Sequence, residues 1–425
     1  MIRQQRSWLS RAYTGGIVTA LLCSGRGDLL AQHPTPVSPE PGSELTIYLM
    51  TFGPGEQIWE RFGHNAIGVR DAAAGTDSVF DYGRFSFTEK GFLVHFMQGR
   101  MFYWMGSADA NWYANLYVNW HRSVWIQELN LTPKQRLEVR DFLRWNEQPE
   151  NIRYRYDYYR DNCSTRVRDV IDRVMGGAFR RQTDTVTTGT TFRFHTQRLT
   201  TADVPMYTGL LSAMGHPIDQ PITAWEEMFL PLSVRKFVRT VKIPGPNGQE
   251  VPLVKSEHTV YENHAIETRD APPPWTPYYL LVGAAIGGVG LGLARMGTTR
   301  PWARLSFMTL GTFWYLVMGL GGLILLCLWA LTDHAVTYQN ENILQFDLLA
   351  LPLVVLLPSG IRRGGRRRLL ALRLSVVVAT ISLAGLLIKL LPWFYQVNLQ
   401  VIALILPVYL GLAAGLFALA GRDVG

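Results

Sequence analysis

Apolar residues form two different patterns on either side of residue 270. Before it, short apolar runs alternate with polar residues and turns, which predicts an α+β domain over residues 44–270. After it, apolar runs near the bilayer-spanning length of roughly 20 residues follow one another and predict an all-α polytopic membrane domain over residues 278–425. We place five runs at about 278–294, 305–331, 343–358, 374–391 and 399–420. Pro-rich residues 271–277 form the predicted linker.

Basic residues are distributed unevenly between the loops of this membrane domain. Arginines occur in the loops 295–304 and 359–373, whereas the loops 332–342 and 392–398 contain no Lys or Arg. Because basic loops stay in the cytoplasm, five spans place residues 44–270 outside the cytoplasm and the C-terminus inside. Much of the net charge of +8 therefore reflects membrane topology. No nucleic-acid-binding motif accompanies it, so a nucleic-acid partner is not expected.

The N-terminus has the pattern of an export signal. Residues 1–32 begin with three arginines in residues 1–11, continue with a short apolar stretch and then small residues, and so predict a signal peptide or an N-terminal anchor. Residues 33–43 are a Pro-rich tether. Export of the chain agrees with the orientation derived from the loops.

Cys163 is the one cysteine in the polar part of the chain, since Cys23 and Cys327 lie in apolar segments. Three cysteines placed in this way build neither a disulfide framework nor a Cys-based zinc site. Asp161 and Asn162 are good N-cap residues, and apolar residues recur at helical spacing after them. Cys163 is therefore expected in the first helical turn, where the dipole stabilises a thiolate. It is a candidate nucleophile, and a buried structural cysteine is the alternative.

A cysteine nucleophile needs a base, and His64 is the best candidate among the histidines of the domain. It lies on a predicted strand at residues 63–69, with small residues on its face that leave room for a substrate. Asp81, on a second predicted strand at residues 78–83, is the candidate partner for the other ring nitrogen. The backbone N–H of Cys163 or of its neighbours can hold an oxyanion.

Three further segments leave alternatives open. Residues 84–127 are rich in aromatic side chains, which pack in a core or instead form an acyl-chain groove or a face on the membrane interface. The polar segment 333–345 is either a connecting loop or a contact for a headgroup or substrate. Residues 234–242 and 250–255 are predicted as two strands around a turn.

The order of a strand histidine, a polar strand residue and a cysteine at a helix N-terminus is similar to the circularly permuted papain-like (NlpC/P60-like) thiol fold. More specific phrases resemble the bacterial Lnb-type lipoprotein N-acyltransferases, in which an extracytoplasmic thiol domain is fused to transmembrane helices. These phrases are residues 61–66, 80–83, 159–166, 219–222 and 229–231.

The resemblance implies a multi-pass protein of the bacterial cytoplasmic (inner) membrane with a periplasmic thiol domain. Cys163, with His64 and Asp81, would take an acyl chain from a membrane phospholipid as a thioester. The acceptor would be the α-amine of a diacylglyceryl-cysteine lipoprotein. Neither a metal nor a diffusible cofactor is implied.

The resemblance also extends to His334, Asn340 and Asn342 in the membrane-domain loop, which become candidate substrate contacts. Arg193 and Asp219 are two more candidates for substrate binding, with support of the fold as the alternative.

Two other classes of function remain open. A cell-wall thiol peptidase or amidase would use the same Cys163 and His64, but it has no evident need for five spans. A membrane sensor or transport accessory would not be an enzyme, and it should tolerate serine in place of Cys163.

Overall fold

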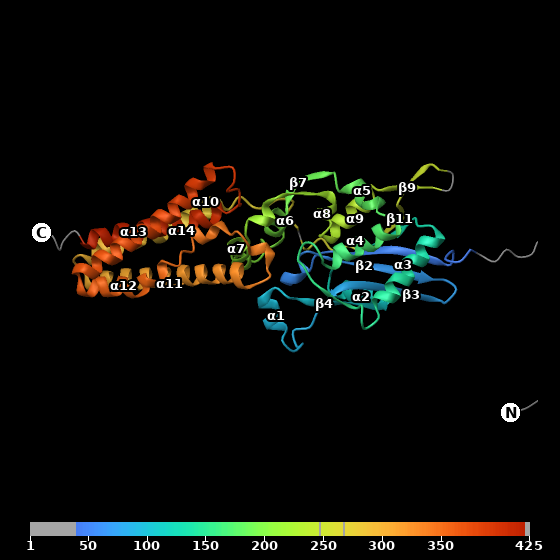
Figure 1. The fold of residues 1–425 in the computed structure, drawn as a ribbon, viewed down its shortest axis with the longest axis horizontal. Helices are drawn as coiled ribbons and strands as arrows, with labels where there is room; N and C mark the ends of the chain where they lie inside the picture. Colours follow the sequence, from blue (N-terminus) through green and yellow to red (C-terminus); the bar gives the residue numbers. More distant parts are fainter. Residues whose placement is uncertain (1–39, 246–247, 267, 421–425) are drawn as a thin grey trace, which may run out of the picture. The chain divides into compact units, whose positions relative to one another are not determined.

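The computed structural model describes residues 40–245, 248–266 and 268–420, which belong to one compact unit. The predicted export signal at residues 1–32, and the tether as far as residue 39, lie outside the described residues. The described chain is a mixed α/β domain followed by a helical region (Figure 1). The predicted fold class is thereby confirmed.

An antiparallel sheet forms the centre of the α/β domain. Within the described residues it has seven strands in the order β11-β5-β1-β2-β3-β4-β6. Their bounds are β1 (Leu45–Phe52), β2 (His64–Asp71), β3 (Thr76–Arg84), β4 (Phe102–Asp109), β5 (Val124–Leu129), β6 (Arg153–Arg155) and β11 (Val254–Tyr261). The pairing of β2 with β3 sets Ala66 opposite Asp81. Because alternate residues share a face, His64 lies diagonally across from Asp81.

Both faces of this sheet are covered by helices. Along β1, Ile47 and Leu49 enter one hydrophobic core, while Tyr48 and Met50 enter another. The first core also contains residues of α3 (Pro133–Asn146), α4 (Cys163–Val174) and α9 (Pro231–Val238). The second contains residues of α2 (Ala110–Asn119). The strands therefore alternate between two buried faces rather than between a core and solvent.

Local signals for the two central helices are confirmed by their cap geometry. Thr132 accepts a hydrogen bond from the Gln135 N–H, and the Gln135 side chain accepts one from the Thr132 N–H, which is the predicted capping box before α3. Helix α4 begins at Cys163 behind Asn162, its N-cap. After α4, Gly176 has a positive φ of 60°, as expected where a helix stops.

The predicted strand at residues 234–242 is wrong, because most of it belongs to helix α9. Pro231 occupies the first turn, and Val234, Phe237 and Val238 recur at helical spacing and are buried together. Only its last residue is in β9 (Lys242–Pro244), which pairs with β10 (Glu250–Pro252). The other predicted strand is therefore divided between β10 and the start of β11.

Short elements fill the rest of the α/β domain. They are η1 (Ile58–Glu60), α1 (Phe92–Gln98), α5 (Ala178–Thr183), β7 (Thr187–Thr191), α6 (Phe192–Leu199), α7 (Val204–Ala213), η2 (His216–Asp219), β8 (Pro221–Thr223) and α8 (Ala224–Glu227). Among them, α7 places Tyr207 and Leu211 in the hydrophobic core of the helical region.

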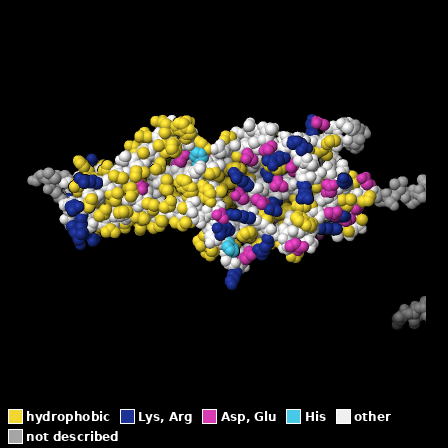
Figure 2. All heavy atoms as spheres, viewed as in Figure 1, with side chains coloured by type: hydrophobic (Ala, Val, Ile, Leu, Met, Phe, Trp, Pro, Cys, Tyr) yellow, Lys and Arg dark blue, Asp and Glu magenta, His cyan; other side chains and the backbone are white. Residues whose placement is uncertain are grey.

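Within the described residues, four helices are long and apolar enough to span a membrane. They are α10 (Thr276–Gly297), α11 (Pro301–Leu331), α13 (Gly365–Leu387) and α14 (Leu399–Ala420). Figure 2 shows hydrophobic side chains over this helical region and mixed charges over the α/β domain. The length and composition of these helices therefore indicate a multi-pass membrane protein.

The apolar run predicted at residues 343–358 is not a fifth long helix. It is divided between η4 (Glu341–Leu344), an irregular segment, and α12 (Ala350–Arg363), whose 14 residues rise about 21 Å. In the irregular segment, the Gln345 amide donates to the Ser382 carbonyl (3.1 Å), and the Tyr409 hydroxyl donates to the Gln345 carbonyl (2.9 Å). Neighbouring helices thus supply the partners that allow non-helical backbone between spans.

Candidate active site

Cys163 is a free, half-buried cysteine at the first position of α4. The preceding Asn162 accepts hydrogen bonds from the Ser164 N–H (2.8 Å) and the Thr165 N–H (2.9 Å) through its side-chain oxygen. Its side-chain nitrogen donates to the carbonyls of Tyr158 and Phe229 (3.0 Å each). The start of the helix, and with it the thiol, is therefore fixed from both sides.

Gly83 lies directly beside the thiol. A Cβ atom at this position would be 3.3 Å from the Cys163 Cβ, and the backbone has a positive φ of 90°. The pairing of β3 with β4 is irregular between Asp81 and Arg84, which includes this glycine. Both the space and the conformation therefore favour glycine at this position.

His64 connects the thiol to Asp81. Its Nε2 lies 3.1 Å from the Asp81 Oδ2, and the Cys163 thiol is close enough to raise the pKa of the ring. Because Nε2 is bound to Asp81, Nδ1 is the ring nitrogen that can exchange a proton with the thiol. The ring is stacked on Phe52 and on Tyr117, each at a centroid distance of 6.1 Å, so the aromatic rings hold its orientation.

Asp81 is buried and is shared between two positively charged partners. Besides His64, it receives hydrogen bonds from the Arg84 Nε (2.8 Å) and Nη2 (2.6 Å) at its Oδ1. Burial alone would raise the pKa of Asp81, but the hydrogen bond and charge of His64 and the charge of Arg84 lower it below its usual value. Asp81 is therefore held as a carboxylate.

The environment of His64 favours the protonated imidazole. Burial by itself would lower the pKa of His64, but its interactions with Tyr117, Cys163 and Asp81 raise this pKa well above 6.5. The three side chains can therefore hold and move one proton between the thiol and the ring, with Asp81 orienting the ring.

Sequence reasoning missed three residues that position this thiol site (Cys163, His64 and Asp81). Arg84 reaches Asp81 only because of the irregular pairing after Asp81, which strand alternation does not reveal. Tyr117 comes from α2 on the same face of the sheet. Asn65 donates to the Ser164 Oγ (3.1 Å) and ties β2 to α4. The position of Asn65 next to His64 in the sequence was the one signal that could have identified any of these three residues.

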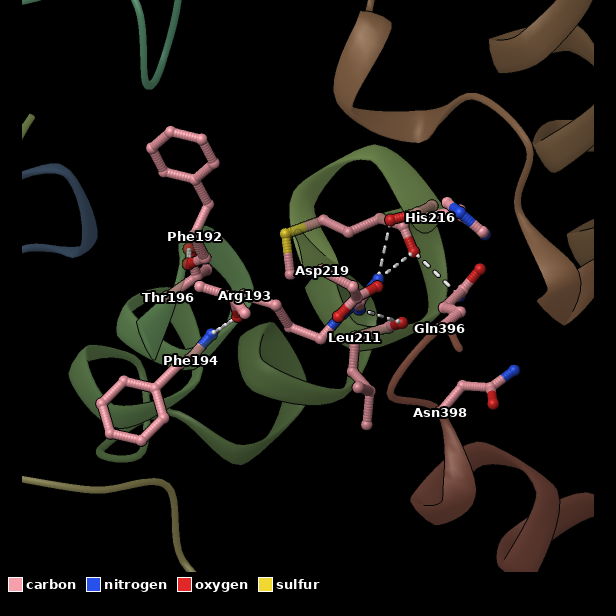
Figure 3. A network of polar contacts seen from close by, with 12 residues as sticks. Phe192, Arg193, Phe194, Thr196, Leu211, His216, Asp219, Gln396 and Asn398 are labelled. Carbon is pink, nitrogen blue, oxygen red and sulfur yellow. Dashed lines mark hydrogen bonds and ion pairs between the residues drawn. The ribbon is translucent and has the colours of Figure 1, made fainter. Parts of the chain in front are cut away.

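Two of the predicted substrate contacts, Arg193 and Asp219, form a fully buried ion pair (Figure 3). The Arg193 Nε donates to the Asp219 Oδ1 (2.7 Å). The Arg193 Nη2 also donates to the carbonyls of Met214 and Gly215 (2.9 Å each), which follow α7. The pair therefore binds the C-terminal end of α7 rather than an open cavity.

Asn340 and Asn342 reach the same end of α7 from the membrane-domain loop. The side-chain nitrogen of Asn340 donates to the carbonyls of Ser212 and Ala213 (2.9 Å each), and that of Asn342 donates to the carbonyl of Leu211 (3.1 Å). Both side chains are buried. With Gln396 and Asn398, which bond to Asn340 and Asn342, these residues and the Arg193–Asp219 pair form what we call the α7 cap network.

Helix C-termini leave carbonyl groups without intrahelical partners, and the α7 cap network supplies partners for these carbonyls. This geometry accounts for Arg193, Asp219, Asn340 and Asn342 without a substrate. A substrate contact by any of them stays a prediction that their burial does not favour.

His334 lies apart from this network, at the junction of α11 with α1. Its Nε2 lies 2.8 Å from the Phe96 carbonyl, and its ring stacks on Tyr158 at 6.1 Å. The neighbouring Asp333 accepts hydrogen bonds from Arg100 (2.9 Å) and Arg155 (3.0 Å). The loop therefore joins the membrane helices to the α/β domain, and its predicted substrate contact is untested.

No group of three or more His, Cys, Asp or Glu side chains comes together as a metal site within the described residues.

The family model described as the Lnb N-terminal periplasmic domain matches residues 41–201. The matched segment contains Cys163, His64 and Asp81 and ends before the membrane helices. No curated protein and no solved structure matches the chain. The match confirms the Lnb-type resemblance inferred from the sequence.

Proposed function

We propose that this chain is a lipoprotein N-acyltransferase that works through an acyl-thioester on Cys163. The proposal starts from the match of residues 41–201 to the Lnb N-terminal periplasmic domain. The observation that carries the proposal is the connection of a half-buried thiol at a helix N-terminus to His64 and Asp81. A second support is that this domain is bonded to membrane helices, where both lipid substrates would reside.

In the first half-reaction, the Cys163 sulfur attacks the ester carbonyl carbon of a membrane phospholipid while His64 holds the proton of the thiol. Collapse of the tetrahedral intermediate breaks the ester C–O bond, and His64 gives its proton to the leaving alkoxide. The products are an acyl-thioester on Cys163 and a lysophospholipid.

In the second half-reaction, the α-amine of a diacylglyceryl-cysteine lipoprotein attacks the thioester carbonyl. His64 takes a proton from the amine and returns it to the departing thiolate, so an amide forms and the thiol is regenerated. The acceptor receives one acyl chain, and Asp81 stabilises the imidazolium in both halves.

One backbone group is the best donor for the oxyanion in both halves. Asn162 already occupies the N–H groups of Ser164 and Thr165, so among the groups at the start of α4 the Cys163 N–H is the candidate. The helix dipole adds to its effect, because developing negative charge is stabilised at a helix N-terminus.

The test is intact-mass analysis of the N-terminal lipopeptide of a model lipoprotein, in cells that lack their own N-acyltransferase. Wild-type protein should add one amide-linked acyl chain, and Cys163→Ala should add none at equal protein level in the membrane. Cys327→Ala is the matched control, because Cys327 is the other free thiol of the described residues and lies in α11.

Addition of an acyl chain by Cys163→Ala would reject the thioester. No added chain with wild-type protein present in the membrane would reject the acyl transfer itself and favour the wall peptidase or amidase.

A further inference from the structure

Helix α1 is mostly apolar although it lies on the surface of the α/β domain: all of its residues except His95 and Gln98 are apolar. None of its seven residues is buried, and Leu93, Val94, Phe96 and Met97 are 65%, 50%, 40% and 54% exposed. Apolar helix residues are normally buried in a protein core or in a membrane. An exposed apolar patch of this kind marks a contact surface.

Neighbouring residues extend this surface beyond the helix. Phe87 precedes α1 and is 65% exposed, and Phe102 follows it and is 48% exposed. Phe87 packs on Phe92 at a centroid distance of 5.3 Å, so the two segments form one surface. Of the residues 84–127, these exposed side chains fit the predicted membrane face, whereas Tyr103 and other buried aromatics pack in the core.

The position of α1 relative to the membrane helices decides what covers it. Span α11 ends at Leu331, and two residues later the Asp333 N–H donates to the Gln98 carbonyl at the end of α1 (2.8 Å). The bond between His334 and the Phe96 carbonyl (2.8 Å) is a second attachment. Figure 1 shows α1 beside this end of α11. Helix α1 is therefore held at the level where the chain leaves the bilayer.

We propose that α1, with Phe87 and Phe102, is a lipid-binding arm whose apolar side chains insert into the extracytoplasmic leaflet of the bilayer. Its occupant is lipid hydrocarbon, because α1 is hydrogen-bonded to residues 333 and 334, directly after a membrane span. The exposed basic residues Lys90 and Arg100 flank the arm, as is typical of helices in a membrane interface.

The arm is also connected to the thiol site by aromatic packing. Phe92 stacks on Phe85 (5.8 Å), and Phe85 stacks on Tyr103 (5.0 Å), which in turn packs on Tyr156 (4.4 Å). Phe85, Phe92, Tyr156 and Cys163 border the same hydrophobic core. Insertion of the arm would therefore bring bilayer lipid to the side of the domain that carries the thiol.

The test uses spin labels on the full-length chain in vesicles of phosphatidylethanolamine and phosphatidylglycerol. Cys23, Cys163 and Cys327 are replaced by serine, and a single label is attached at Leu93→Cys or Met97→Cys. The matched control is Trp145→Cys in α3, because Trp145 is 55% exposed on the same domain. Collision rates with oxygen, which concentrates in lipid, and with a water-soluble nickel chelate are then measured.

Higher accessibility to oxygen than to nickel at positions 93 and 97, with the reverse at 145, is the expected result. Higher accessibility to nickel at all three positions would overturn the proposal. Low accessibility to both reagents at positions 93 and 97 would also overturn it, because a protein partner or a second copy would then cover the arm. None of these readouts depends on acyl transfer, so the arm can fail or succeed independently of the proposed function.

Discussion

The thiol site and the α7 cap network are both polar clusters that contain residues marked as functional by the sequence, but they differ in what their polar groups bind. At the thiol site, side chains bind one another and leave a half-buried sulfur. In the α7 cap network, side chains bind the backbone carbonyls of residues 211–215 and are buried. A residue that the sequence marks as functional can therefore take part in the reaction, or it can hold the α/β domain to the membrane helices. The groups that its side chain binds distinguish these two roles.

The largest expected effect is on catalysis and separates the two clusters. His64→Ala should lower the rate of acyl transfer by roughly 10²–10⁴-fold, because it removes the group that moves the proton. The amount of folded protein should change much less than the rate, because Arg84 still pairs with the Asp81 carboxylate. Lysophospholipid release measured in a single turnover is the assay, and His258→Ala on β11, an exposed histidine, is the control. A His64→Ala protein with wild-type rate would remove His64 from the mechanism.

The next effect is on stability and should leave chemistry per folded molecule unchanged. Arg193→Ala leaves Asp219 buried without its partner, which we expect to cost about 3–5 kcal/mol of the free energy of unfolding. Thermal unfolding in detergent measures this loss. Arg180→Ala is the control, since its ion pair with Asp184 is exposed and is worth less than about 1 kcal/mol.

Arg193→Ala protein that stays stable but loses turnover would instead place Arg193 at the substrate. That result would break the distinction between the two clusters.

A smaller loss of stability is expected for the residues of the α7 cap network that come from the membrane domain. Asn342→Ala removes the donor to the carbonyls of Leu211 and Ser212, and we expect a cost of about 1–3 kcal/mol. Limited proteolysis near α7 should become faster. Asn115→Ala, an exposed position in α2, should show neither change. Equal proteolysis of the two variants would mean that the contact between the membrane domain and the end of α7 does not depend on Asn342.

The smallest effect is a shift in pH dependence at the thiol site. The folded chain raises the pKa of His64 above its unfolded value of 6.5. The bound proton therefore stabilises the fold fully below pH 6.5, and this contribution is lost as the pH rises through the raised pKa. Asp81→Asn removes one group that raises this pKa, so the alkaline limb of lysophospholipid release should move to lower pH.

The control for this shift is Asp77→Asn on the same strand, whose partner is Arg70. An unchanged alkaline limb in Asp81→Asn would mean that Asp81 does not set the protonation of His64.

Local patterns predicted the elements that hold the thiol site. Strand alternation around His64 and Asp81, and the N-cap before Cys163, are set by neighbours in sequence, so they could be read directly. Arg84 could not, because an irregular strand pairing turns it back toward Asp81. The same limit explains α9, where Val234 and Val238 favour strands in isolation but are buried on one helix face.

Long-range contacts account for the remaining differences. The apolar run at residues 343–358 has the hydropathy of a span, but Gln345 obtains partners from α13 and α14, and this allows an irregular segment. Arg193 and Asp219 are 26 residues apart, and nothing in either segment indicates that they pair. The sequence therefore marked both residues as candidates without showing whether they bind substrate or support the fold.

The placement of α7 has a consequence for anyone who wants to work with the thiol domain alone. Tyr207 and Leu211 pack in the core of the membrane helices, and Trp275 of the linker region packs on Tyr207 at 5.0 Å. A soluble fragment cut at the linker would carry α7 into water with an uncovered apolar face and bare carbonyls. Inhibitor screening and protein engineering therefore need the full-length chain, because a cut at the linker does not separate two independent modules.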